Sequence, residues 1–182
     1  FPRFVGAGLT VFVAAAALVS TFPLWSRVTN AKEGAISAVD GAIGVDRFSL
    51  FLTAVICVSV ILVALLADGY LRREGLDGPE LYLLMLMSAA GAVVMVSAND
   101  LIVLFIGLEV VSIAAYVLAA MHTRRLSSQE AGIKYFVLGS FGSAILLYGI
   151  ALVYGATGST SLLHAQEFLS SHLVTHDGLL LA

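Results

Sequence analysis

The chain alternates between long apolar stretches and short polar ones. Each long stretch is close to the roughly 20 residues that an α-helix needs to cross the hydrocarbon core of a bilayer. The pattern predicts five spanning helices, at Phe4–Trp25, Phe48–Ala67, Leu81–Ala98, Leu101–Met121 and Gly132–Tyr154, with a sixth beginning near Gly178. We therefore expect an all-α membrane protein, a polytopic helical bundle forming one membrane domain over residues 1–182. Because the chain starts at a phenylalanine and stops inside an apolar run, we expect a segment of a longer protein.

The polar stretches predict the connections. Residues 26–47 contain glycines and polar residues, typical of an exposed loop with a short strand. Asn99 and Asp100 predict a tight turn, and Asp100 can cap the next helix. Ser127 or Ser128 is a candidate N-cap for the fifth helix. Gly155–Asp177 has partial helical periodicity, which predicts a helix along the membrane surface.

Composition narrows the class further. The chain is 60% hydrophobic and 12% charged, with a mean hydropathy of +1.02, whereas soluble domains carry about 25% charged residues. No basic patch is available for phosphates, so nucleic acid is excluded as a partner. Cys57 is the single cysteine, so the chain offers no internal disulfide and no Cys-x-x-Cys pair for zinc or iron–sulfur clusters. We expect no redox centre and no bound cofactor in this chain.

The basic residues predict the orientation, because Lys and Arg near helix ends stay on the cytoplasmic side. Five basic residues fall on one side of the predicted bundle and three on the other. The larger group is Arg3, Arg72, Arg73, Arg124 and Arg125, and the smaller is Arg27, Lys32 and Arg47. Arg3 and the loop His122–Ala131, which holds Arg124 and Arg125, are therefore expected in the cytoplasm. The stretch Gly155–Asp177, which has no Lys or Arg, is expected outside.

Glu109 is the first candidate for chemistry, because it lies near the middle of a predicted spanning helix. An ionisable group at that depth costs at least a few kcal/mol and usually marks a path for protons, ions or substrate. Ser112 and Tyr116 follow at offsets of three and seven, so they form a supporting polar face with Glu109. The alternative is a structural carboxylate held by a hydrogen bond between helices.

Lys134 is the second candidate for proton transfer, and the alternative is a lysine that extends to the membrane surface. If its helix begins at Gly132, Lys134 lies only about 3 Å along that helix, whereas Glu109 lies about 18 Å below Met121. A direct pair between the two is not expected. The cation for Glu109 is predicted on a helix beyond Ala182.

Other patterns carry less chemistry. His164, His172 and His176 lie close together, which leaves a metal site open, but solvated loop histidines are the favoured interpretation. Gly139-x-x-x-Ser143 is a small-x-x-x-small pattern that allows two helices to approach closely. No Gly-rich phosphate loop and no Ser-His-Asp set is found in the sequence.

Two windows of sequence carry a family resemblance. The first is ANDLIVLFIGLEVVSIAAYVL at Ala98–Leu118, and the second is EAGIKYFVLG at Glu130–Gly139 followed by LYGIALVYGATG at Leu147–Gly158. The stretch VDRFS at Val45–Ser49 fits as well, so the match covers most of residues 45–160. Together they resemble the antiporter-like membrane subunit N of NADH–quinone oxidoreductase, respiratory complex I, whose mitochondrial counterpart is NADH dehydrogenase subunit 2. Related subunits and cation/proton antiporters share the glutamate window, and the Lys-Tyr-Phe continuation favours subunit N.

The resemblance implies a fold of about fourteen helices with two inverted repeats of five, of which this chain would supply the second to sixth helices. It implies that Glu109 is the proton-channel glutamate, that Lys134 matches a lysine of the sixth helix, and that the key partner lysine lies on the seventh. It also implies proton translocation coupled to quinone reduction, with NADH, FMN, iron–sulfur clusters and quinone bound by other subunits.

The implied partners are the lipid bilayer and other membrane-arm subunits of complex I. The implied location is a bacterial plasma membrane, favoured over the mitochondrial inner membrane. Two alternatives stay open: a subunit of a multi-subunit sodium/proton antiporter, and a structural membrane spacer.

Overall fold

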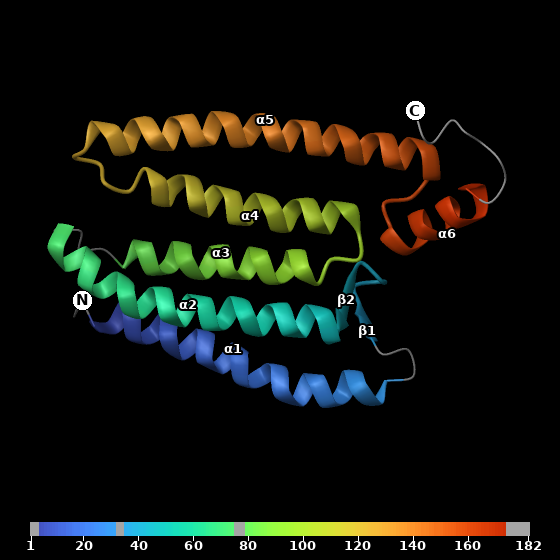
Figure 1. Cartoon of the computed structure of the whole chain (residues 1–182), viewed down its shortest axis with the longest axis horizontal. Coiled ribbons are helices and arrows are strands. Elements are labelled where there is room, and N and C mark those ends of the chain that lie inside the picture. The colour runs from blue at the N-terminus through green and yellow to red at the C-terminus, as the bar shows by residue number, and fades with distance from the viewer. Residues whose placement is uncertain (1–3, 32–34, 75–78, 174–182) are drawn as a thin grey trace.

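The computed structural model describes residues 4–31, 35–74 and 79–173. Five long helices run antiparallel in chain order, each against the next (Figure 1). A short hairpin and a surface helix lie at one end of this bundle. The elements are α1 Phe4–Asn30, β1 Ala35–Ala38, β2 Ile43–Asp46, α2 Arg47–Glu74, α3 Glu80–Val96, α4 Leu101–Ala119, α5 Leu126–Thr157 and α6 Leu162–Leu173.

Each of the five predicted spanning segments contains a helix, and three of these helices are longer than predicted. α1 continues to Asn30, α2 continues to Glu74, and α5 begins at Leu126 instead of Gly132. Helical hydrogen bonding does not stop where the hydrocarbon core stops, so polar residues extend a spanning helix into the surface layer. The predicted sixth span near Gly178 lies outside the described residues.

Four of the described helices are long and apolar enough to cross a membrane. Among the five long helices the exception is α3, which has 17 residues and is about 26 Å long. Most large apolar side chains on the long helices are exposed, among them Phe12, Leu66 and Leu138. In a membrane protein such exposed apolar surfaces contact lipid tails or further helices and not water.

The backbones of α3 and α4 approach each other closely at two glycines. A Cβ placed on Gly91 would lie 2.9 Å from the Gly107 carbonyl oxygen, and one on Gly107 would lie 2.8 Å from the Met95 backbone nitrogen. The two backbones therefore touch, as small residues allow in membrane helices. This contact fixes one face of α4 against α3.

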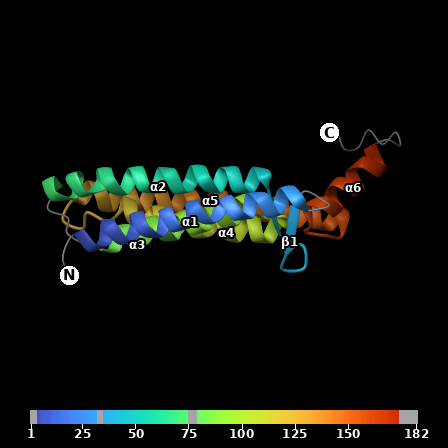
Figure 2. The same ribbon diagram turned by 90° about the horizontal axis from the view of Figure 1, so that it is seen from below.

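The hairpin and the surface helix are tied to the turn between α3 and α4. The backbone N–H of Gly44 donates to the carbonyl of Ser97 over 2.8 Å, and the N–H of Asn99 donates to Ala42 over 2.9 Å. On the other side, the N–H of Leu101 donates to Thr160 over 2.9 Å. Figure 2 shows α6 beyond the ends of the long helices, which confirms the helix predicted within Gly155–Asp177. Its position along the membrane surface stays a prediction.

The helix caps confirm one prediction and correct another. Asp100 caps α4 as predicted, since its carboxylate accepts from the N–H of Ile102 over 2.8 Å. The N-cap of α5 is Arg125, not Ser127 or Ser128. Ser128 instead donates over 2.7 Å to the carbonyl oxygen of Ala119. It therefore satisfies the last turn of α4, whose carbonyls have no partner within their own helix.

The two ends of the bundle match the predicted division of basic residues. Arg73, Arg124 and Arg125 lie at the end where α2 meets α3 and α4 meets α5, whereas Arg27 and Arg47 lie at the end that carries the hairpin (Figure 1). Arg3 and Lys32 lie outside the described residues. We call these the basic end and the hairpin end.

Candidate functional site

Glu109 lies within one residue of the midpoint of α4 and is half-buried. The hydroxyl of Ser143, near the midpoint of α5, donates a hydrogen bond to its Oε1. This is the one hydrogen bond that the side-chain carboxylate of Glu109 makes with the described residues. The carboxylate is thus held between two helices at the depth where the membrane interior is most apolar.

Two faces of α4 have different partners. Gly107 contacts α3, whereas Glu109 and Tyr116 contact residues of α5. Ser112 lies between Glu109 and Tyr116 on the polar face, by the helical period. The predicted polar stripe therefore points into the bundle, toward α5.

Tyr116 packs against α5 where that helix has no side chain. A Cβ on Gly139 would overlap the Tyr116 hydroxyl and ring. The Tyr116 ring also makes edge contacts with Tyr135 and Phe136, at centroid distances of 4.9 and 5.7 Å. Gly139 thus provides the space for Tyr116, and the two flanking aromatic rings limit its movement.

Lys134 has a different partner from Glu109. Its ammonium lies 2.5 Å from Oε1 of Glu130, one turn earlier on α5, and both side chains are mostly exposed. Lys134 precedes Ser143 by nine residues, which is about two and a half turns. Lys134 therefore projects from the side of α5 opposite to the side that carries Ser143.

The predicted start of the fifth helix was wrong. Because α5 begins at Leu126, Lys134 lies about 12 Å along the helix instead of about 3 Å. Lys134 still lies nine residues, about 14 Å, along α5 from the Ser143 that bonds Glu109. The axial distance and the opposite sides of α5 together separate Lys134 from Glu109, in agreement with the prediction that the two make no direct pair. The i, i+4 spacing of Glu130 and Lys134 was the signal for their ion pair.

Ser143 is the site residue that sequence reasoning missed as a polar partner. It was identified as a packing residue only. The available signal was a hydroxyl in the middle of a spanning helix, where polar side chains tend to bond across helices.

A second polar cluster lies at the basic end. Nη2 of Arg125 lies 2.5 Å from Oε2 of Glu74, and Nε2 of His122 lies 3.8 Å from the same oxygen. Nδ1 of His122 is buried and has no hydrogen-bond partner among the described residues. These contacts join the end of α2 to the α4–α5 connection.

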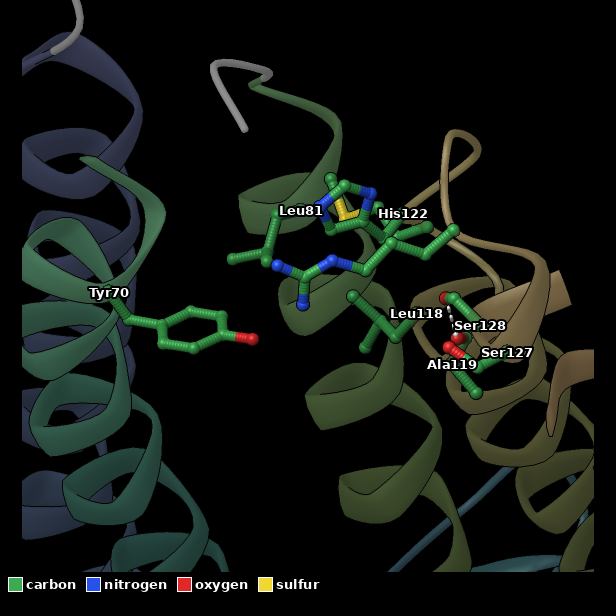
Figure 3. Close-up of a pocket in the computed structure, with 9 residues that line it drawn as sticks. Tyr70, Leu81, Leu118, Ala119, His122, Ser127 and Ser128 are labelled. Atoms are coloured by element: carbon green, nitrogen blue, oxygen red, sulfur yellow. Dashed lines mark hydrogen bonds between the residues drawn. The ribbon is translucent and has the colours of Figure 1, made fainter. Parts of the chain in front are cut away.

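An open cavity of about 310 Å³ lies beside this cluster. Figure 3 shows Tyr70 projecting from α2 toward Leu81, Leu118 and His122, with Ser127 and Ser128 at the far side. No sequence pattern indicated this cavity, because its lining comes from three separate stretches of the chain, at Tyr70, at Leu81 and at residues 118–128.

The described residues contain no group of three His, Cys, Asp or Glu side chains able to hold a metal ion. His164 is exposed on α6. The side chain of His172 and all of His176 lie outside the described part, so the histidine alternative stays untested.

Residues 98–181 match a family model described as NADH:quinone oxidoreductase/Mrp antiporter, TM. The protein named NADH-quinone oxidoreductase subunit N 1 from Sorangium cellulosum is 51% identical to this chain over 125 residues, which cover 69% of this chain and 25% of the relative. The chain belongs to this family. Subunit N from Methylobacterium nodulans is 42% identical over 154 residues, covering 85% of this chain and 31% of the relative.

Chains of two solved respiratory complexes have a similar fold. A chain of respiratory complex I from Thermus thermophilus matches with a TM-score of 0.71 and 29% identity, over 93% of this chain and 38% of that one. A chain of an archaeal membrane-bound sulfane sulfur reductase matches with a TM-score of 0.70 and 27% identity, over 90% of this chain and 37% of that one. The resemblance to subunit N is thereby confirmed. The chain spans a quarter to a third of the length of these curated relatives.

Proposed function

We propose that this chain is part of a proton-translocating membrane-arm subunit of an NADH–quinone oxidoreductase, and that Glu109 takes up and releases the transferred proton. The observation that carries this proposal is the carboxylate of Glu109 in the middle of α4, bonded only to Ser143 among the described residues. It lies within the segment that matches the family model.

The energetics favour a carboxylate that changes its protonation. Removing an ion from water costs several kcal/mol even after relaxation. One hydrogen bond to a charged group returns about 1.5–3 kcal/mol. Ser143 therefore offsets only part of the cost, and Glu109 needs either a proton or a cation from outside the described residues. Exchange between these two states is proton transfer.

Lys134 is proposed as a second proton-transfer group, acting on the other side of α5. Its ion pair with Glu130 is exposed on this chain, and helices of the full-length subunit would cover that surface. Burial would strengthen the ion pair, because screening by water falls. In this arrangement Lys134 exchanges protons with groups beyond the chain and not with Glu109 directly.

The driving reaction is placed in other subunits. NADH, FMN, iron–sulfur clusters and quinone would be bound there, and charge changes along the membrane arm would reach Glu109 through its partner cation. The assembly partners would be the other membrane-arm subunits, in a bacterial plasma membrane. The bacterial relatives of this chain support that location.

The test is Glu109→Gln in the intact complex, reconstituted in vesicles. NADH oxidation and internal acidification are measured together. We expect a sharp loss of proton pumping or coupled activity, because glutamine keeps the hydrogen-bonding shape but cannot exchange a proton. Glu167→Gln on the exposed surface of α6 is the matched control. Pumping near the wild-type level in Glu109→Gln would reject the role and would favour a structural spacer.

A second candidate is a subunit of a multi-subunit sodium/proton antiporter. The family description, which names Mrp antiporters, favours it. Purification of the full-length subunit from its native membrane separates the two. Co-purification of NADH-oxidising flavin and iron–sulfur subunits supports the first proposal. Their absence, together with sodium-dependent proton exchange, supports the antiporter.

A further inference from the structure

Most of the hydrogen-bonded hydroxyl side chains in the long helices bond within their own helix. These donate to a backbone carbonyl three or four residues earlier, as Thr10, Thr53 and Ser59 do. This is the usual choice of serine and threonine in membrane helices. Ser143 instead donates across the interface to the side chain of Glu109. Its orientation is therefore set by the carboxylate of another helix.

We infer that Ser143 is a positioning residue for Glu109, and that the contact of Tyr116 with Gly139 sets the helix spacing on which this hydrogen bond depends. The inference rests on the proposed function of Glu109. By this inference α5 contributes to proton transfer through Ser143, independently of Lys134. We call Glu109, Ser143, Tyr116 and Gly139 the α4–α5 seam.

A serine hydroxyl suits a group that changes protonation. It donates to a carboxylate, and it accepts from a protonated carboxyl group by rotating its own hydrogen. Ser143 can thus keep Glu109 in place before and after a proton arrives. Since the hydrogen bond occupies Oε1, Oε2 is left for the partner cation. Proton transfer then adds one proton to Glu109 and removes one from the partner, while Ser143 ends unchanged.

The seam depends on the close approach of α4 and α5 on the basic side of Glu109. A Cβ on Gly132 would lie 2.5 Å from Cβ of Ala120, and one on Gly139 would overlap Tyr116. Gly139 precedes Ser143 by one helical turn, about 6 Å along the axis. A side chain at position 139 would push α5 away beside Ser143 and lengthen its bond to Glu109.

The first experiment compares Ser143→Ala with Ser143→Thr in the intact complex. Ser143→Ala removes the one hydrogen bond that the Glu109 carboxylate makes with the described residues. We expect Ser143→Ala to lower proton pumping several-fold and to shift the infrared carboxyl band of Glu109, which is the band lost in Glu109→Gln. Threonine keeps the hydroxyl and should restore both. Ser140→Ala, at an exposed position on the same helix, should change neither.

The second experiment tests the spacing without touching a hydroxyl. Gly139→Ala should reproduce the loss of pumping seen in Ser143→Ala. Gly142→Ala is the matched control, because a Cβ there meets nothing within 4 Å, and it should pump normally. Each variant is first checked for assembly by native gel electrophoresis. If Ser143→Ala fails to assemble, Gly139→Ala is compared with Gly142→Ala for pumping and for the infrared band of Glu109; normal pumping with an unshifted band in Gly139→Ala overturns the inference.

The outcomes separate the two proposals. Wild-type pumping in Glu109→Gln overturns the proposed function and this inference with it. Loss of pumping in Glu109→Gln, with wild-type pumping and an unshifted carboxyl band in Ser143→Ala, overturns this inference alone. Normal pumping in an assembled Gly139→Ala complex overturns the part assigned to helix spacing.

Discussion

Gly107→Ala should destabilise the subunit, because the added methyl group meets backbone and not a side chain. Its Cβ would lie 2.8 Å from the nitrogen of Met95, whereas ordinary contacts begin at 3.4 Å. The backbones of α3 and α4 must therefore separate locally by about 0.6 Å or bend. Overpacking of this kind typically costs about 1–3 kcal/mol.

The matched control is Gly69→Ala in α2, where a Cβ meets nothing within 4 Å. Alanine raises helix propensity by about 1 kcal/mol over glycine at both positions. This gain is the same in both variants, so the difference in stability between Gly107→Ala and Gly69→Ala measures the steric clash alone, at about 1–3 kcal/mol. The measurement is the temperature at which half of the tagged subunit aggregates when the detergent-solubilised complex is heated. The reasoning is refuted if Gly107→Ala aggregates at the same temperature as Gly69→Ala or at a higher one.

Three further predictions concern polar contacts at the two ends and on α5. Asp100→Ala removes the cap of α4 and the 2.5 Å hydrogen bond from Thr160. We expect the local stability at the start of α4 to fall by about 2–4 kcal/mol, which is measured as faster amide hydrogen exchange there. A double-mutant cycle on Glu74 and Arg125 should give a coupling energy of only about 0.2–1 kcal/mol, which falls as salt is added. The reason is that the Arg125 side chain is 56% exposed. A larger coupling energy that salt does not change, measured in the assembled complex, would show that another subunit buries the pair. Lys134→Gln should lower proton pumping without shifting the infrared band of Glu109, because Lys134 lies on the other side of α5; a shifted band would indicate direct coupling.

The close approaches of helices have a direct consequence for the site. α4 is fixed by glycine contacts on one face and carries its carboxylate on another. A rigid support for the reacting group keeps its hydrogen-bond geometry constant while its charge changes. The α3–α4 contact and the α4–α5 seam thus serve one site, although only the seam touches Glu109.

Much of the fold could be predicted from apolar length, because the bilayer imposes one dimension on every spanning helix. The positions of the five segments, the cap at Asp100, the surface helix and the polar stripe of α4 all followed from local patterns. The helix ends in the surface layer could not be predicted as well, because hydropathy falls there before helical hydrogen bonding stops. For this reason the start of α5 was placed six residues late and Lys134 too close to the helix end.

The sequence by itself determined that Glu109 is an expensive charge on a face shared with Ser112 and Tyr116, because that conclusion needs only hydropathy and a helical period. Only the tertiary structure decided that this face meets α5, that Ser143 is the hydrogen-bond partner, and that Lys134 points the other way. Those relations depend on the rotation and register of two helices. Both are set by glycines that let backbones approach, through contacts that no single helix contains.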